Sequence, residues 1–148
     1  MFVREERSLG RSFEAVVEEF AQVPRMWLPD IAEATLGTAE GASARLDAAG
    51  LSKKVSIQVG SALRETARAV MPMRVVATGP AGLFPQLDAD LELLATGPST
   101  VMLRLTGSYR VPLGTAGRLL DRMLLHRAAE ASLRHFLKRV SERLLALT

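Results

Sequence analysis

The chain has 148 residues, of which 48% are hydrophobic and 24% charged, with a formal net charge of +3 and no cysteine. This length and composition predict one globular domain spanning residues 1–148, and they exclude a disordered or low-complexity chain. A chain without cysteine has no disulfides, thiolate metal sites or cysteine nucleophiles, which fits a cytoplasmic location. The charged start and the lack of a long apolar run indicate neither a signal peptide nor a membrane-spanning helix.

The N-terminal third predicts a strand followed by two short helical pieces. Residues 2–9 form a weakly alternating strand. Apolar residues spaced three and four apart over 12–20 predict an amphipathic helix that ends before Pro24. A second helical piece at 25–28 is limited to one short turn, because prolines flank it on both sides. Glycine-rich turns around a short strand at 42–46 are expected to follow.

The middle of the chain alternates apolar and polar residues with a period of two, as half-buried strands do. Such strands are typical of an antiparallel sheet that is covered on one face only. Pro72 cannot donate to a strand ladder, so we expect an edge position or a bulge there. Gly97-Pro98-Ser99 predicts a hairpin turn between the last two strands. The four expected strands are 55–59, 71–77, 87–93 and 101–109.

The final segment predicts one long helix. From Leu119 onward, apolar residues recur at spacings of three and four and form a continuous stripe. A helix with one apolar face needs a broad apolar surface, which the inner face of the sheet supplies. The fold class is therefore α+β, with the C-terminal helix lying across a curved antiparallel sheet. The stripe consists of Leu119, Met123, His126, Glu130, Leu133, Leu137, Val140, Leu144 and Leu147.

The positive charge of the chain is concentrated in this final segment. From Arg118 to the end there are seven basic and three acidic residues, whereas the rest of the chain has 12 basic and 13 acidic residues. Binding of nucleic acid or of an anionic membrane through the arginine-rich helix would predict a steep salt dependence. Only His135 and Phe136 place aromatic rings among these arginines, so we interpret the basic residues as a solvated helix face.

Several segments carry a resemblance to a known family. They are the helix at 12–20 leading into 23–30 with its single tryptophan, the connection at 78–85, and the turn at 112–114 before the final helix. Over essentially its whole length, the chain resembles the START-like or polyketide-cyclase superfamily, also called SRPBCC. This resemblance implies a helix-grip fold, in which the sheet wraps around the C-terminal helix. It also implies a deep apolar cavity that binds lipids, sterols, polyketides or hormones, and some family members are cyclases or dehydratases.

His126 and Glu130 are the most informative pair in the apolar stripe. Four residues apart on a helix, they are neighbours on one face. A glutamate on an apolar face requires a partner, and an adjacent imidazole is a suitable one. The pair could orient a ligand in the cavity or act as acid and base. It could equally be a buried structural pair, which is the commoner use of such residues.

Other candidate ligand-binding residues follow from the phase of the strands and from the expected cavity. Tyr109 has the inward phase, so its hydroxyl could meet a ligand or cap the rim of the core. Trp27 lies near the expected cavity entrance and could stack on a ligand or plug the junction between helix and sheet. Flexible thioethers suit adaptable pockets but also fill ordinary cores. The remaining inward candidates are Met71, Met73, Leu91, Leu105 and Met123.

Several chemistries are absent from the sequence. His126 and His135 are nine residues apart and face different sides of the helix, so they cannot share a metal. No phosphate-binding loop, dinucleotide fingerprint or nucleophile elbow is present, and no cofactor is implied. The sequence therefore predicts a protein that binds a hydrophobic small molecule or lipid and no nucleic acid. The alternative is a cyclase- or dehydratase-like enzyme that uses His126 and Glu130.

Overall fold

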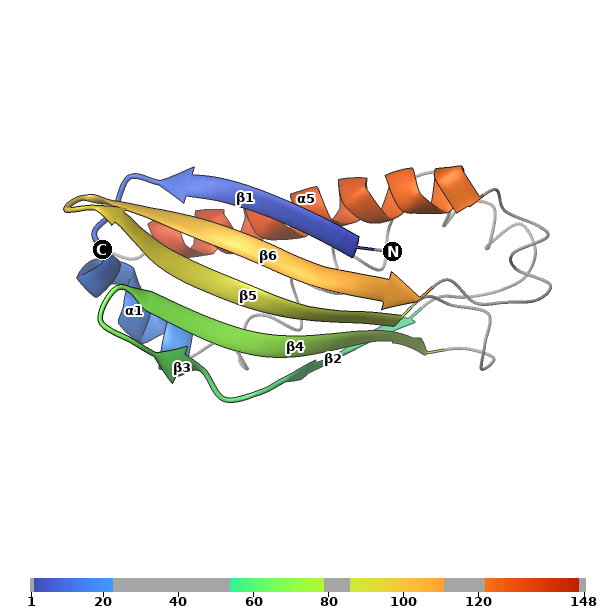
Figure 1. Ribbon diagram of the computed structural model, residues 1–148, viewed down its shortest axis with the longest axis horizontal. Helices are drawn as coiled ribbons and strands as arrows, with labels where there is room; N and C mark the ends of the chain where they lie inside the picture. Colours follow the sequence, from blue (N-terminus) through green and yellow to red (C-terminus); the bar gives the residue numbers. More distant parts are fainter. Residues whose placement is uncertain (1, 23–53, 79–85, 111–121, 147–148) are drawn as a thin grey trace.

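A computed structural model describes residues 2–22, 54–78, 86–110 and 122–146. Within these ranges the protein has six strands, one N-terminal helix and one C-terminal helix (Figure 1). The expected helical piece at 25–28 and the expected strand at 42–46 lie outside the described residues. In chain order the elements are β1 (Phe2–Leu9), α1 (Phe13–Gln22), β2 (Lys54–Val59), β3 (Leu63–Arg64), β4 (Arg68–Thr78), β5 (Gln86–Gly97), β6 (Thr100–Arg110) and α5 (Arg122–Leu145).

The strands form one antiparallel sheet in the order β1-β6-β5-β4-β2, and β3 pairs with β4 beside β2. Helix α5 runs lengthwise along one face of this sheet, and α1 lies near the end where β5 turns into β6 (Figure 1). We call the face toward α5 the inner face and the opposite one the outer face. The predicted α+β arrangement, with a C-terminal helix across an antiparallel sheet, is confirmed.

All four strands expected in the middle of the chain are present as β2, β4, β5 and β6. Met71, Leu91 and Leu105 pair in register across β4, β5 and β6, and all three are buried on the inner face. The predicted hairpin turn is confirmed, because β5 ends at Gly97 and β6 begins at Thr100. Alternation with a period of two therefore located the strands and also their covered face.

Pro72 lies inside β4, which has β5 on one side and β2 and β3 on the other, so the expected edge position is wrong. Its carbonyl accepts a hydrogen bond of 2.8 Å from the Gly60 amide. The side of Pro72 that lacks a donor therefore faces the interval between Val59 and Leu63, where β2 has ended and β3 has not begun. A Cβ on Gly60 would lie 2.7 Å from Pro72 Cγ, so the close approach requires glycine. The neighbouring strands supply the irregularity that proline needs.

Helix α1 begins after Ser12, whose hydroxyl oxygen accepts a hydrogen bond of 3.3 Å from the Ala15 amide. This contact satisfies one of the amides that lack a partner in the first turn of a helix. The apolar spacing predicted for the segment places one face of the helix in the core. The buried residues are Phe13, Val16, Val17 and Phe20.

The described side chains of α5 confirm the predicted stripe from Leu133 onward, since Leu133, Leu137, Val140 and Leu144 are buried. Phe136, which the sequence placed among the arginines, is fully buried as well, so the covered arc is wider than the stripe. Arg11 donates a hydrogen bond of 3.3 Å to the Leu145 carbonyl, which links the end of α5 to the segment before α1. Within the described residues, no helix is both long and apolar enough to cross a membrane.

Candidate functional site

Four of the predicted ligand-binding residues lie together on the inner face of the sheet. Met71, Leu91 and Leu105 form one cross-strand row, and Met73 belongs to the next row, away from the β5–β6 turn. The first three are at most 1% exposed, within the same apolar cluster as the buried residues of α1 and α5. In the described structure these three side chains are part of the core.

The next row, which we call the small row, has two small residues at its centre, Ala89 and Gly107. Met73 pairs with Ala89, Ala89 with Gly107, and Gly107 with Val3. A Cβ on Gly107 would lie 2.5 Å from the Asp88 carbonyl oxygen and 2.6 Å from Ala89 Cβ, so only glycine fits this close approach of β5 and β6. At Ala89 and Gly107, therefore, the side chains rise least above the backbone of the sheet on its inner face.

Burial also changes along the inner face. Nearest the β5–β6 turn, Leu93, Leu103 and Val101 have no exposed surface. In the small row Ala89 retains 7% exposure, and beyond it Val75 and Leu87 retain 7% and 8%. We call these parts the hairpin half (Ala69, Met71, Leu91, Leu93, Val101, Leu103 and Leu105) and the distal half (Met73, Val75, Leu87, Ala89 and Gly107). The distal half is covered less closely than the hairpin half.

The other predicted site residues are only partly described. Trp27 and the side chains of Tyr109, Met123 and His126 lie outside the described residues, although the backbone of Tyr109 pairs with Leu87. Glu130 is half-buried and already engaged in an interaction within the protein. The contact expected between His126 and Glu130 stays a prediction.

On the outer face of the hairpin half, a ladder of charged side chains crosses four strands. Glu6 on β1 accepts hydrogen bonds of 2.9 Å from Arg4 and from Arg104, which lies opposite it on β6. Glu92 on β5 accepts from Arg104 at 3.3 Å and from Arg68 on β4 at 2.7 Å. Carboxylates and guanidinium groups alternate along this ladder, so each charge has a partner of opposite sign.

The ladder shifts the ionisation of its members in the direction its contacts require. Hydrogen bonds from Arg4 and then Arg104 hold the pKa of Glu6 below its usual value. The hydrogen bond to Glu92 raises the pKa of Arg68 above its usual value. Each contact favours the charged form of its partner, so the ladder is a set of stable ion pairs.

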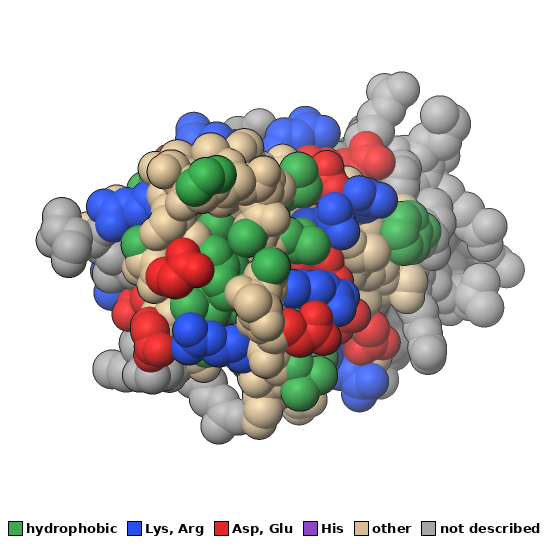
Figure 2. Space-filling model, turned by 60° about the vertical axis from the view of Figure 1, so that its left-hand side comes forward, with side chains coloured by type: hydrophobic (Ala, Val, Ile, Leu, Met, Phe, Trp, Pro, Cys, Tyr) green, Lys and Arg blue, Asp and Glu red, His purple; other side chains and the backbone are tan. Residues whose placement is uncertain are grey.

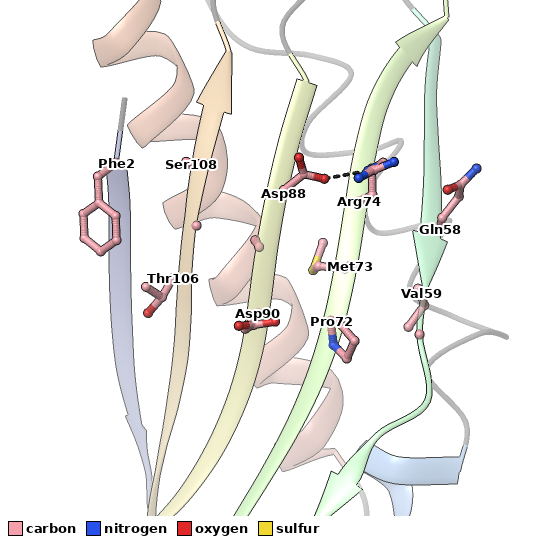
Figure 3. A pocket seen from close by; sticks show the side chains of 13 residues that line it. Phe2, Gln58, Val59, Pro72, Met73, Arg74, Asp88, Asp90, Thr106 and Ser108 are labelled. Carbon is pink, nitrogen blue, oxygen red and sulfur yellow. Dashed lines mark hydrogen bonds and ion pairs between the residues drawn. The ribbon is translucent and has the colours of Figure 1, made fainter.

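The outer face of the distal half is hollowed into an open trough of about 750 Å³. The side chains of Phe2, Thr106, Asp90, Asp88 and Arg74 project around it from the face opposite α5 (Figure 3). The Arg74 guanidinium and the Asp88 carboxylate lie 2.6 Å apart. This outer trough lies on the other side of the sheet from the predicted cavity and is a different feature.

Neither the outer trough nor the small row beneath it was predicted from the sequence. The available signal was size, because Gly107 and Ala89 are small residues between larger inward ones on the two best-defined strands. No group of three potential ligands among the described residues could hold a metal ion. The described chemistry is therefore that of an inner face that is apolar except for Glu5 and Arg7 of β1, and of a polar, charge-paired outer face.

No family model and no curated protein sequence matches the chain. Among solved structures, a conserved protein from Geobacillus kaustophilus is similar over 97% of this chain and 95% of its own, with a TM-score of 0.60 and 12% identity. The protein TTHA0849 from Thermus thermophilus is similar over 99% of this chain and 98% of its own, with a TM-score of 0.51 and 21% identity. Norcoclaurine synthase from Thalictrum flavum, solved with dopamine and hydroxybenzaldehyde, gives a TM-score of 0.48 at 11% identity over 96% of this chain and 87% of its own. At these identities, the first two show a shared fold only. Membership of the START-like superfamily stays a prediction.

Proposed function

We propose that this protein binds a hydrophobic small molecule or lipid between the distal half of the sheet and α5. The observation that carries the proposal is the step in packing along the inner face. Fully buried leucines fill the hairpin half, whereas Ala89 and Gly107 leave the distal half low and incompletely covered. A pocket for an apolar ligand requires apolar walls and a place where small side chains leave volume for the ligand.

Two alanines on the inner face provide a matched test of this proposal. Ala69 lies in the closely packed hairpin half and Ala89 in the distal half. In Ala89→Leu, the added side chain occupies the space assigned to the ligand, so affinity for a fluorescent fatty-acid or sterol probe should fall about tenfold or more. Ala69→Leu should leave the affinity of the folded protein unchanged, because its site is already full.

Native mass spectrometry of the purified wild-type protein gives the direct measurement. A co-purified apolar molecule, reduced in Ala89→Leu and retained in Ala69→Leu, is the expected result. If the protein carries no molecule and binds neither probe, or if both variants lose the probe equally, the proposal is wrong.

A cyclase- or dehydratase-like reaction is the second candidate, and the half-buried position of Glu130 favours it. An acid or base beside an apolar pocket could protonate or deprotonate a bound carbonyl compound. In that case, the Glu130→Gln variant should retain the unreacted precursor. The mass of this bound precursor should exceed that of the molecule bound to the wild-type protein by at least one water. A purely binding protein should carry the same molecule in both forms.

A further inference from the structure

The outward face of α5 is a strongly basic surface. Among its described side chains, Arg134, His135, Lys138, Arg139 and Arg143 are all exposed, and Glu142 is the one exposed carboxylate. Arg139 lies 3.4 Å from Glu142, and Arg134 lies 3.4 Å from Glu5. Within the described residues, no ion pair involves the Lys138 or Arg143 side chain, and the four exposed Arg and Lys side chains of α5 outnumber its one exposed carboxylate.

The outer face of the sheet does not share this imbalance. Its exposed arginines are matched by carboxylates: Arg4 by Glu6, Arg74 by Asp88 and Arg64, at the sheet edge, by Glu18. On the face that Figure 2 presents, basic and acidic side chains are interspersed, with no large area of one sign. Among the described residues, the unbalanced positive charge therefore lies on the exposed half of α5.

One exposed apolar side chain lies on the side of α5 that carries Arg134 and Lys138, about 160° around the helix from Arg143. Leu145 is 43% exposed. The spacing of 3.6 residues per turn places it in line with Arg134 and Lys138. Basic residues beside an exposed leucine on a helix are typical of a surface that rests against lipid headgroups. The described side chains of α5, residues 130–145, extend over about 24 Å of the helix, so they offer a long contact line.

We propose that the outward face of α5 docks on the surface of a membrane that contains anionic lipids. A bilayer with negatively charged headgroups complements the unpaired cations of Lys138 and Arg143. The choice of a membrane over another polyanion rests on the proposed function, since a lipid or another poorly soluble ligand is exchanged with a bilayer. In this position, the inner face is separated from the membrane by one helix only.

The test uses full-length protein with vesicles of phosphatidylcholine alone or with about one third phosphatidylserine. The protein should sediment with the anionic vesicles and not with the neutral ones. Each basic residue near such a surface contributes about fivefold to binding, so Lys138→Gln with Arg143→Gln should lower binding about 25-fold. Raising the salt to about 0.5 M should abolish most of the binding, because it screens exposed charges.

The matched control is Arg64→Gln with Arg74→Gln. It changes the net charge equally but removes cations that have carboxylate partners 2.9 and 2.6 Å away. It should change vesicle binding by less than about threefold. Circular dichroism melts should show both double variants folded.

Three results would overturn the proposal. The first is equal binding to neutral and anionic vesicles, and the second is an equal loss of binding in the control variant. The third is that the protein binds duplex DNA but no vesicles, and that Lys138→Gln with Arg143→Gln abolishes this DNA binding. The proposed function is measured separately, by probe binding without vesicles. A protein that binds the probe but no vesicles contradicts the docking surface alone, whereas one that binds anionic vesicles but no probe contradicts the ligand site alone.

Discussion

Toward the β5–β6 turn, fully buried leucines lie beneath the sheet, and the ladder from Glu6 to Arg68 crosses its outer face. Toward the other end, the inner face drops to Ala89 and Gly107, and the outer face is hollowed into the outer trough. The same three strands, β4, β5 and β6, run through both halves. Backbone pairing therefore continues along the whole sheet, while the inward side chains are fully buried in one half and slightly exposed in the other.

The largest expected difference between the halves concerns two leucines on β5. Leu93 has no exposed surface and Leu87 retains 8%. Leu93→Ala should lower the free energy of unfolding by about 3–5 kcal/mol, because the closely packed hairpin half cannot collapse around the lost volume. Leu87→Ala should cost about 2 kcal/mol. Urea unfolding measures both, and equal losses would show that the halves are packed alike.

Adding volume should give the next largest difference. Ala69→Leu inserts a large side chain into the hairpin half and should lower stability by about 1–3 kcal/mol. Ala89→Leu should cost less than about 1 kcal/mol, because the distal half has room for the added atoms. Chemical unfolding of the ligand-free variants makes this comparison. Greater destabilisation by Ala89→Leu would remove the packing difference on which the ligand site depends.

On the outer face, the contrast is between Glu92 and Asp88. The Glu92 side chain is 11% exposed and bonded to two arginines, whereas Asp88 is 38% exposed in its pair with Arg74. Glu92→Gln should cost about 1–2 kcal/mol, because a poorly solvated charge-assisted contact is lost. Asp88→Asn should cost less than about 1 kcal/mol, as for an exposed pair. If both variants lose the same free energy of unfolding in urea, the contacts of Glu92 stabilise the protein no more than the ion pair of Asp88 with Arg74 does.

Acid should reveal the smallest effect, through Glu6. Arg4 and Arg104 hold the pKa of Glu6 below its usual 4.5 in the folded protein. The folded state therefore binds the proton more weakly than the unfolded state, and the stabilising contribution is complete above about pH 5. It is lost as the pH falls through the folded pKa. Glu6→Gln should accordingly be less stable than wild type at pH 7, with a difference that shrinks below pH 4 in urea titrations.

Local pattern was enough to predict the five longer strands, α1 and the covered face of the sheet, but not the two-residue strand β3. Along 87–93 and 101–109, apolar and polar residues alternate, which indicates the side chains that face away from water. This pattern can be read within each segment, without knowledge of its neighbours. Phe136 was misjudged because the covered arc of α5 depends on the width of the sheet and on α1, both remote in sequence. The ladder was not predicted, since the contacts of Glu6 with Arg104 and of Arg104 with Glu92 require the register of three strands.

The candidate site was harder to predict than the fold. Met71, Leu91 and Leu105 have the inward phase of a cavity lining, but phase does not distinguish a lining from a filled core. That distinction depends on the volume of neighbours across the sheet, and the small row of Ala89 and Gly107 exists only after β5 and β6 pair. The outer trough follows from the same pairing, which brings Thr106, Asp90 and Pro72 level with one another.

The pairing of β1 with β6 has a consequence for how the chain folds as it is made. Phe2 pairs with Ser108 and Leu9 with Val101, so the earliest described strand meets its partner only after nearly all of the sheet has been synthesised. Contacts between such distant segments slow folding. A ribosome adds about 5–20 residues per second, so β1 waits for several seconds before β6 emerges. During that interval its apolar residues depend on chaperones, on non-native contacts, or on the later strands for protection from aggregation.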